Sequence, residues 1–338
     1  MEYKGVMVFA EQEESVIHPV TFELLGKGRE LADRLGVELT SVLLGDGVGD
    51  KATILIHHGA DKVYLFEDQS LKEFDPLRYK ENIVPLLRDV KPEAFLIGAT
   101  RVGRTLAPRI AAALRTGLTA DCTDLDLDEE GNLIQIRPAF SGNIMARIRT
   151  RTRPQIATVR YKVMKPAEPN PERRGEVIKR DVKVIEDSGL RILKKEPGKG
   201  VDLTEAEVIV SCGRGVKSRE DLVIFKELAA LLGGVFGSSR PLVDCGWVER
   251  EHQVGFSGNI VKPKVYIACG ISGSPQHLFG MRDSDIIIAI NKDPSAPIFS
   301  VADYGFVGDI YEIVPILIKK IKEQRRTAKN LKFLQHGT

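Results

Sequence analysis

The sequence predicts an α/β fold built from parallel sheets and divided into two successive domains. Short apolar runs alternate with longer stretches in which apolar residues recur at helical spacing, first from residue 6 and again after residue 205. Alternating strands and helices form parallel sheets joined by right-handed crossovers. A length of 338 residues and an apolar fraction of 43% suit two domains, each with its own core.

The first domain begins with a regular series of strands and helices. We expect strands at Val6–Ala10, Leu39–Leu44, Val63–Phe66 and Ala94–Gly98, and helices at Pro19–Leu35, Lys51–His58 and Leu77–Val90. Another helix starts within GATRVGRTLAPR, where the amino end beside Thr100 and Arg101 could hold an anion. We favour the alternative, in which Arg101 and Arg104 are solvated or contact another subunit.

From Thr119 to Val163 the pattern changes to strands joined by turns. DLDLDEEGNLIQIRPA is typical of a hairpin that turns at Glu130, Gly131 and Asn132. Four arginines follow at alternate positions, so in one strand they would share a face: Arg147, Arg149, Arg151 and Arg153. A solvated face is the commoner explanation of such a run. We favour a contact with a protein partner or the other domain.

Two stretches have the composition of connections. MKPAEPNPERRGE, at 164–176, holds three prolines among charges and is predicted to be a linker, followed by a β-like tail at Val177–Leu193. KKEPGKGVDLTEAE marks the domain boundary. The predicted domains are 1–200 and 201–325, with a helix at Tyr311–Lys322 closing the second and a basic tail at 326–338.

Composition excludes several classes of function. The formal net charge is +2, from 49 basic and 47 acidic residues, so no bulk attraction to nucleic acid or membrane is expected. No apolar run reaches the length of a membrane span, and the amino terminus lacks a secretory signal. We therefore expect a cytoplasmic chain that is not a transmembrane protein. Cys122, Cys212, Cys245 and Cys269 show no metal-ligand spacing, and the six histidines show no zinc motif, so we predict free thiols and no metal.

The second domain is centred on a glycine-rich stretch from Gly233 to Gly280, where backbone N–H groups can approach a flat or phosphorylated ligand. Before it, EVIVSCGRGVKS reads as strand, turn and helix. Only Gly213 and Gly215 fit the dinucleotide motif GxGxxG, because Ser218 takes the third position. The match to an NAD-binding motif is therefore weak. After the next strand, where an NAD-binding protein would have Asp or Glu, Arg240 would at most indicate NADP.

Six blocks in this half carry a resemblance. They are GRGVKS (Gly213–Ser218), SSRPLVDCGW (Ser238–Trp247), QVGFSG (Gln253–Gly258), GISGSPQHLFGM (Gly270–Met281), INKDPSAPIF (Ile290–Phe299) and VADYGFVGD (Val301–Asp309). In this order they resemble the FAD-binding half of the electron-transfer flavoprotein (ETF) α subunit. The resemblance implies a nucleotide-hydrolase-like (HUP-type) α/β domain, then a doubly wound FAD-binding domain similar to deoxyhypusine synthase.

The resemblance also implies roles for particular residues. Arg240 would lie against the isoalloxazine ring and favour its anionic reduced form, Ser257 would hydrogen-bond flavin N5, and His277 would face the O2 edge. For Arg240 the alternative is a pair with Asp244. For Ser239, a contact with the ring edge or phosphate competes with a role as helix N-cap.

The remaining residues would surround the rest of the cofactor. Ser272 and the GISGS turn would hold the diphosphate, with Arg214 beside it, while Asn291, Lys292 and Asp309 would lie near the adenosine and ribityl end. Asp309 is equally suited to capping the last helix. The predicted FAD-binding set is Arg214, Ser239, Arg240, Gln253, Val254, Gly255, Ser257, Gly258, Gly270, Ser272, Gly273, Gln276, His277, Asn291, Lys292 and Asp309.

The function implied is electron transfer in a heterodimer with an ETF β subunit, which carries AMP or a second FAD. The first domain would pack on that subunit and bind no nucleotide of its own, and a flexible connection would let the FAD domain move between partners. Electrons would come from an acyl-CoA dehydrogenase-type partner and pass to a membrane quinone oxidoreductase. The chain would be a redox carrier subunit with no catalytic residue, since GFSGN does not match GxSxG.

Three alternatives stay open. In a bifurcating ETF, NADH would reduce the β subunit's flavin, and its electrons would divide between ferredoxin or flavodoxin and the α-bound FAD. An NADP-linked enzyme on the same half-fold is more remote, because no catalytic residue for it is visible. A flavin-free scaffold subunit is disfavoured by Arg240, Ser257 and His277 occurring together.

Overall fold

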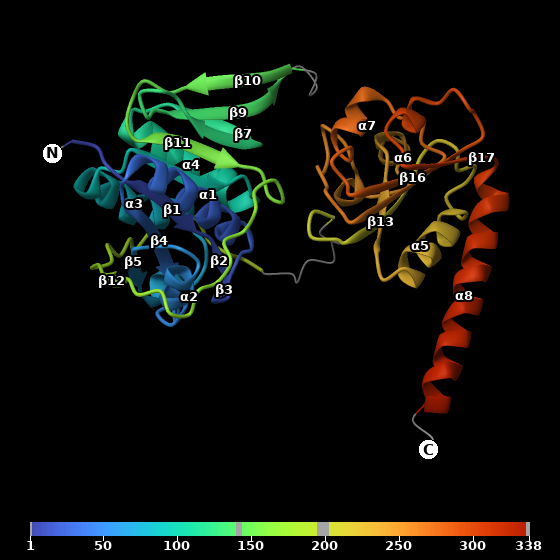
Figure 1. The fold of residues 1–338 in the computed structure, drawn as a ribbon, viewed down its shortest axis with the longest axis horizontal. Helices are drawn as coiled ribbons and strands as arrows, with labels where there is room; N and C mark the ends of the chain where they lie inside the picture. Colours follow the sequence, from blue (N-terminus) through green and yellow to red (C-terminus); the bar gives the residue numbers. More distant parts are fainter. Residues whose placement is uncertain (1, 140–143, 195–202, 336–338) are drawn as a thin grey trace. The chain divides into compact units, whose positions relative to one another are not determined.

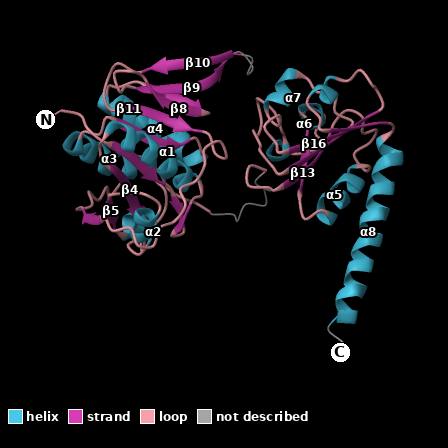
Figure 2. Ribbon diagram, viewed as in Figure 1, coloured by secondary structure: helices cyan, strands magenta, loops and turns pink. Residues whose placement is uncertain are grey.

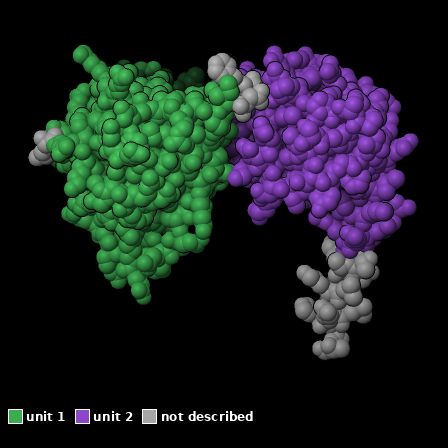
Figure 3. Space-filling view, turned by 45° about the horizontal axis from the view of Figure 1, so that its top comes forward, with its two compact units in different colours: residues 1–193 green, residues 194–338 purple. Residues whose placement is uncertain are grey.

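The computed structural model describes residues 2–139, 144–194 and 203–335, with side chains as far as residue 326. It divides into two compact units, Met1–Leu193 and Lys194–Thr338, which Figure 3 distinguishes by colour. The boundary predicted between residues 200 and 201 lies outside the described residues. In the described part, no helix combines the length and apolar character needed to cross a membrane.

The first unit contains a seven-stranded sheet in the order β12-β5-β4-β1-β6-β11-β7, and every pair in it is parallel. The strands are β1 (Val6–Ala10), β4 (Leu39–Gly45), β5 (Lys62–Glu67), β6 (Ala94–Gly98), β7 (Leu118–Cys122), β11 (Gln155–Val159) and β12 (Glu176–Lys179). The helices are α1 (Val20–Leu35), α2 (Lys51–His57), α3 (Pro76–Val90) and α4 (Arg101–Leu114). The small pieces β2 (Gln12–Glu13), β3 (Val16–Ile17) and η1 (Gln69–Leu71) lie between them. The predicted α/β alternation is therefore present.

Helices cover both faces of this sheet (Figures 1 and 2). Successive side chains of a strand point to opposite faces, and in β1 Val8 packs in the core formed with α1 and α2. Its neighbours Met7 and Phe9 pack in a second core, formed with α3 and α4. Burial on both faces explains why the strand has no polar residue.

A small antiparallel sheet, in the order β10-β9-β8, corrects the prediction about the four arginines. Its strands are β8 (Asp124–Leu127), β9 (Leu133–Ala139) and β10 (Ile144–Arg149), so the last strand holds only Arg147 and Arg149. These pair with Asp126 (3.6 Å) and Asp128 (3.0 Å) in the same unit, while Arg153 follows the strand and pairs with Glu93. The prediction of four arginines on one strand face was wrong, because the strand ends too early.

The proline-rich segment at 164–176, predicted to be a linker, is instead packed against the first unit. The Ala167 N–H donates to the Phe22 carbonyl of α1 (3.0 Å). A Cβ atom at Gly26 would lie 2.5 Å from the Lys165 carbonyl oxygen, so the segment rests directly on this helix. It then enters β12, which is shorter than the predicted Val177–Leu193. Prolines gave this segment the composition of a linker, but its backbone finds partners within the first unit.

The second unit contains a five-stranded parallel sheet in the order β14-β13-β15-β16-β17. The strands are β13 (Val208–Cys212), β14 (Val235–Ser238), β15 (Val265–Cys269), β16 (Ile286–Asn291) and β17 (Tyr304–Val307). The helices are α5 (Leu222–Leu231), α6 (Arg240–Asp244), α7 (Pro275–Phe279) and α8 (Ile310–Gln335), with short turns η3 (Arg250–His252) and η4 (Pro297–Ser300). Helix α8 continues beyond the predicted end at Lys322 and takes in most of the predicted tail at 326–338, of which 336–338 lie outside the described residues.

Candidate functional site

The carboxyl edge of the second sheet brings together all the predicted FAD-binding residues. Asn291 is the last residue of β16, and the others occupy the segments that follow β13, β14, β15, β16 and β17, with the short helices α6 and α7 among them (Figure 1). The strand order reverses direction between β13 and β15. Open parallel sheets bind ligands beyond their carboxyl ends at such a switch point.

Glycines let two loops at the switch point pack backbone against backbone. The Gly213 N–H donates to the Cys269 carbonyl (3.0 Å), and the Gly215 N–H donates to the Gly270 carbonyl (3.1 Å). A Cβ atom at Gly215 would lie 2.8 Å from the Gly270 Cα atom, and Gly270 itself has φ +61°. Only glycine fits this cradle, whose rim carries the exposed Arg214.

Arg240 is another exposed cation at this edge. It is the first residue of α6, and its side chain is 66% exposed. Its Nε lies 3.3 Å from Asp244 Oδ2, so the pairing considered as an alternative is present. An ion pair this exposed contributes little free energy, so the guanidinium can turn toward a ligand at small cost. Ser239 stands at the N-cap position but makes no side-chain capping bond, and its N–H donates to the Cys212 carbonyl (2.9 Å).

The loop at 253–258 is shaped by a buried glutamine and two glycines. Gln253 is buried and donates through Nε2 to the hydroxyl of the exposed Ser257 (2.9 Å). Gly255 has φ +141°, and a Cβ atom at Gly258 would lie 2.4 Å from the Gln253 carbonyl oxygen. Val254 is buried and its N–H donates to the Ser238 carbonyl (2.9 Å), so the loop is anchored to β14.

The loop after β15 is equally constrained. Gly273 has φ +85°, and a Cβ atom there would lie 2.3 Å from the Ile298 backbone nitrogen, whose N–H donates to the Ser272 carbonyl (3.0 Å). The Ser272 and Gln276 side chains are exposed, and the Gln276 carbonyl accepts from the Phe256 N–H (2.8 Å). Exposed polar side chains on a fixed backbone suit recognition of a polar ligand.

His277 differs from the other predicted residues because its ring is inside the protein. It is 5% exposed, its Nδ1 lies 3.1 Å from the Val254 carbonyl oxygen, and its Nε2 lies 3.0 Å from the Tyr266 hydroxyl. Burial lowers the pKa of His277 to about 4. Both ring nitrogens therefore have protein partners, and the imidazole is neutral at pH 7.

Of the three predicted residues at the far end of the edge, Asn291 and Asp309 have structural partners as well. Asn291 is buried and donates through Nδ2 to the Ile271 carbonyl (2.9 Å), which joins the end of β16 to the loop after β15. The Lys292 side chain is exposed. Asp309 accepts from the Tyr311 N–H (2.8 Å) and so caps α8.

The structure adds a cluster that the sequence did not reveal. The Tyr311 hydroxyl donates to Asp221 Oδ2 (2.7 Å) and accepts from the Lys217 N–H (2.7 Å). Asp221 also accepts from the Ser218 N–H (3.1 Å). These contacts tie the first turn of α8 to the turn that carries Arg214. No local pattern could predict them, since Tyr311 and Asp221 are far apart in the sequence.

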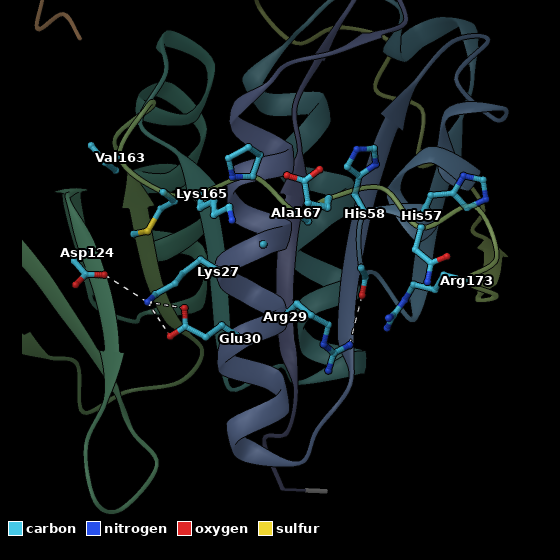
Figure 4. A pocket seen from close by; sticks show the side chains of 16 residues that line it. Lys27, Arg29, Glu30, His57, His58, Asp124, Val163, Lys165, Ala167 and Arg173 are labelled. Carbon is cyan, nitrogen blue, oxygen red and sulfur yellow. Dashed lines mark hydrogen bonds and ion pairs between the residues drawn. The ribbon is translucent and has the colours of Figure 1, made fainter. Parts of the chain in front are cut away.

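The first unit holds a groove of about 610 Å3, shown in Figure 4. It lies between α1 and the segment at 163–173, and His57 and His58 line one end. Its charges are largely matched: Lys27 pairs with Glu30 (3.0 Å) and Asp124 (3.5 Å). The groove contains none of the predicted site residues.

The amino end of α4, considered above as an anion site, already has a carboxyl group. Thr100 Oγ1 accepts from the Gly103 N–H (3.0 Å) and donates to Glu11 Oε2 (2.6 Å). Arg104 lies 3.5 Å from Asp121. These contacts favour the interpretation in which this loop binds no phosphate of its own. Among the described residues, no group of three His, Cys, Asp or Glu side chains comes together that could hold a metal ion.

Fold and site together define a class: a two-unit α/β protein with a dinucleotide site at the carboxyl edge of its second parallel sheet. The glycine cradle and the exposed Arg214 and Arg240 fit a flat, anionic dinucleotide such as FAD. One family model, described as the electron transfer flavoprotein domain, matches residues 6–185. Another, the electron transfer flavoprotein FAD-binding domain, matches residues 202–282.

Curated relatives match over nearly the whole chain. The electron transfer flavoprotein subunit alpha of Thermoanaerobacterium thermosaccharolyticum is 50% identical, over 95% of this chain and 99% of its own. Subunit LctC of the lactate dehydrogenase (NAD(+),ferredoxin) of Acetobacterium woodii is 48% identical, over 95% of this chain and 77% of its own. The acryloyl-CoA reductase electron transfer subunit beta of Anaerotignum propionicum is 43% identical, over 95% of this chain and 96% of its own.

The chain belongs to the electron-transfer flavoprotein α-subunit family. It is thus an FAD-binding electron-transfer protein, and membership implies a β subunit as partner. The resemblance to the ETF α subunit, the fold class and the FAD cofactor predicted from the sequence are confirmed.

Proposed function

We propose that the chain, in a heterodimer with an ETF β subunit, carries electrons on FAD from an acyl-CoA dehydrogenase-type partner to a quinone oxidoreductase. One observation carries this proposal: the segment that matches the FAD-binding family forms the loops at the switch point of the second sheet. Support for an acyl-CoA partner comes from the relative that is named an acryloyl-CoA reductase electron transfer subunit.

FAD supplies the electron-accepting ring, and the protein positions it and adjusts its electrostatics. In the proposal, Arg240 lies against the isoalloxazine and Ser257 hydrogen-bonds its N5 atom, with Gln253, Val254, Gly255 and Gly258 along its edge. Ser239 contacts the ring edge, and Gln276 and His277 belong to the O2 side. Arg214, Gly270, Ser272 and Gly273 hold the diphosphate, and Asn291, Lys292 and Asp309 lie toward the adenosine end. The exposure of Arg240 and Ser257 supports their part in this assignment.

The first unit is proposed to pack on the β subunit, and the domain division at 1–200, 201–325 and 326–338 stays part of the proposal. The second unit would change partners by moving on the connection between them. We place the heterodimer in the cytoplasm. Its free cysteines, of which Cys122, Cys212 and Cys269 are buried, suit a reducing compartment.

A second candidate is a bifurcating ETF, favoured by the relative whose name couples lactate dehydrogenase to NAD(+) and ferredoxin. In that case the β subunit carries a second FAD, which NADH reduces. The electrons then divide between ferredoxin or flavodoxin and the α-bound FAD. The two candidates differ mainly in the β subunit.

Cofactor content of the purified heterodimer tests both. The chain would be co-expressed with its ETF β subunit, FAD and AMP would be quantified after protein denaturation, and NADH would be added anaerobically. One FAD and one AMP, with no reduction by NADH, would support the conventional carrier. Two FAD reduced by NADH would support the bifurcating type. A heterodimer without flavin would overturn the site assignment around Arg240.

A further inference from the structure

A buried pair of side chains lies beneath the two loops of the proposed flavin site. Tyr266, in β15, has no exposed surface, and its hydroxyl lies 3.0 Å from Nε2 of His277 in α7. The other ring nitrogen of His277 lies 3.1 Å from the carbonyl oxygen of Val254, in the loop at 253–258. The imidazole thus connects a core strand to a loop that would line the flavin.

The partners determine where the hydrogens are. A carbonyl oxygen can only accept, so His277 Nδ1 must carry the hydrogen in this contact. A neutral imidazole has one N–H, and so its Nε2 offers a lone pair, which accepts from the Tyr266 hydroxyl. Burial keeps His277 neutral at pH 7, as its lowered pKa indicates, and burial also raises the pKa of Tyr266, which remains a donor.

The contact between His277 and Val254 is one of several that hold the two loops together. The Phe256 N–H donates to the Gln276 carbonyl (2.8 Å). A Cβ atom at Gly280 would lie 2.4 Å from the Gly255 Cα atom, so the backbones are already in contact. Any movement of the Val254 carbonyl would therefore shift the loop that carries Gln253 and Ser257.

We infer that Tyr266 is a positioning residue for the FAD site, because its hydroxyl holds His277 as the Nδ1–H tautomer and thereby clamps the Val254 carbonyl. The inference rests on the proposed function, in which the loop at 253–258 lines the flavin. It changes the role expected of His277. With a lone pair on Nε2, the imidazole offers no N–H to an acceptor such as flavin O2, and it acts through Val254.

Two isosteric substitutions separate the nitrogens of His277. The amide of His277→Asn can place an N–H near the position of Nδ1, whereas the amide of His277→Gln reaches the position of Nε2. Dissociation constants of FAD would be measured by fluorescence for the heterodimer and these variants. We expect H277N to bind FAD at least about tenfold more tightly than H277Q, because it keeps the hydrogen bond to Val254. The reverse order would overturn the inference and assign Nε2 to the flavin.

Tyr266→Phe removes the donor with little change in shape. We expect FAD to bind about tenfold more weakly to Y266F, since one buried hydrogen bond is lost. Tyr79→Phe is the matched control: it also removes a buried hydroxyl, which donates to the Leu71 carbonyl (3.2 Å), but in the first unit. Affinity should be unchanged in Y79F, and an unchanged affinity in Y266F would count against the inference.

Nitrogen-15 NMR of histidine-labelled heterodimer gives a readout that a merely structural role would not produce. With FAD bound, His277 should carry its hydrogen on Nδ1 and should not titrate between pH 5.5 and 8, whereas Y266F should show a changed tautomer or a titration. A hydrogen on Nε2 in the unaltered protein would overturn the inference. If the heterodimer binds FAD and substitutions of Arg240 and Ser257 weaken that binding, the proposed function stands even when the inference about Tyr266 fails. Absence of FAD from the heterodimer would instead count against both.

Discussion

At the scale of single residues, the two units place charge in opposite ways. In the second unit, Arg240 is exposed at the carboxyl edge of the sheet, where a negative ligand would meet it. In the first unit, Glu11 is buried at the amino end of α4 and hydrogen-bonded to Thr100. The Arg240 guanidinium is available to a ligand, whereas the Glu11 carboxyl group occupies the place that an anionic ligand would need.

Replacing Arg240 by alanine should lower the reduction potential of the bound FAD by roughly 50 mV, because a cation near the ring favours its anionic reduced form. Spectroelectrochemistry of the heterodimer would measure the change. Arg240→Lys keeps the charge but not the planar guanidinium, and it should retain most of the potential. Equal potentials in all three proteins would show that Arg240 does not lie near the ring.

Glu11→Gln should change how the stability of the first unit depends on pH. Burial raises the pKa of Glu11 from 4.5 to about 7. Between these values the unfolded chain has lost the proton that the folded chain retains. The free energy of unfolding therefore falls by about 3 kcal/mol as pH rises through this window, and this contribution is fully present below pH 4.5.

Denaturant titrations at pH 5 and pH 8 would test this expectation. Relative to the parent protein, E11Q should be more stable at pH 8 than at pH 5. Glu129→Gln, at an exposed position in the turn between β8 and β9, is the control and should show no such difference. The same pH dependence in E11Q and the parent protein would contradict the assignment.

At the scale of elements, the site depends on how closely its loops approach each other. Gly273 and Gly233 both have positive φ, +85° and +68°. A Cβ atom at Gly273 would meet the Ile298 backbone nitrogen at 2.3 Å, whereas at Gly233 it would meet nothing within 4 Å. The two positions therefore separate backbone strain from steric contact.

Gly273→Ala should destabilise the second unit by about 2–4 kcal/mol and weaken FAD binding, because strain and a clash with backbone add together. Gly233→Ala carries the strain alone and should cost about 1 kcal/mol, with FAD affinity unchanged. Chemical denaturation and FAD titration would measure both effects. Similar losses in the two variants would mean that the loop after β15 can move away from Ile298.

At the scale of the whole molecule, each unit has its own cores. The buried clusters around β1 draw only on the first unit, and those around β13 and β15 draw only on the second. The match to the FAD-binding family model, at residues 202–282, also falls within the second unit. FAD binding should therefore leave most of the first unit's free energy of unfolding unchanged.

Calorimetry of the isolated chain should show two unfolding transitions. FAD should raise the midpoint temperature of only the transition that belongs to the second unit. At a free FAD concentration about 100 times the dissociation constant, the free energy of unfolding of this unit should increase by about 2.7 kcal/mol. The shift of one transition in G273A would identify the second unit. A single transition that moves as a whole with FAD would show that the units unfold together.

Local patterns in the sequence determined the alternation of strands and helices and the two-unit architecture, and the resemblance to a known family determined the cofactor. Apolar periodicity marks elements such as α1 and β1, and the glycine-rich blocks of the second half carry the resemblance to the FAD-binding family. Tertiary structure alone decided the partners of individual side chains. Arg153 pairs with Glu93 outside any strand, the segment at 164–176 rests on α1, and His277 turns inward to Tyr266 and Val254. The reason is physical: periodicity reports which side of an element is buried, whereas a hydrogen bond between distant residues depends on where the folded chain places both of its atoms.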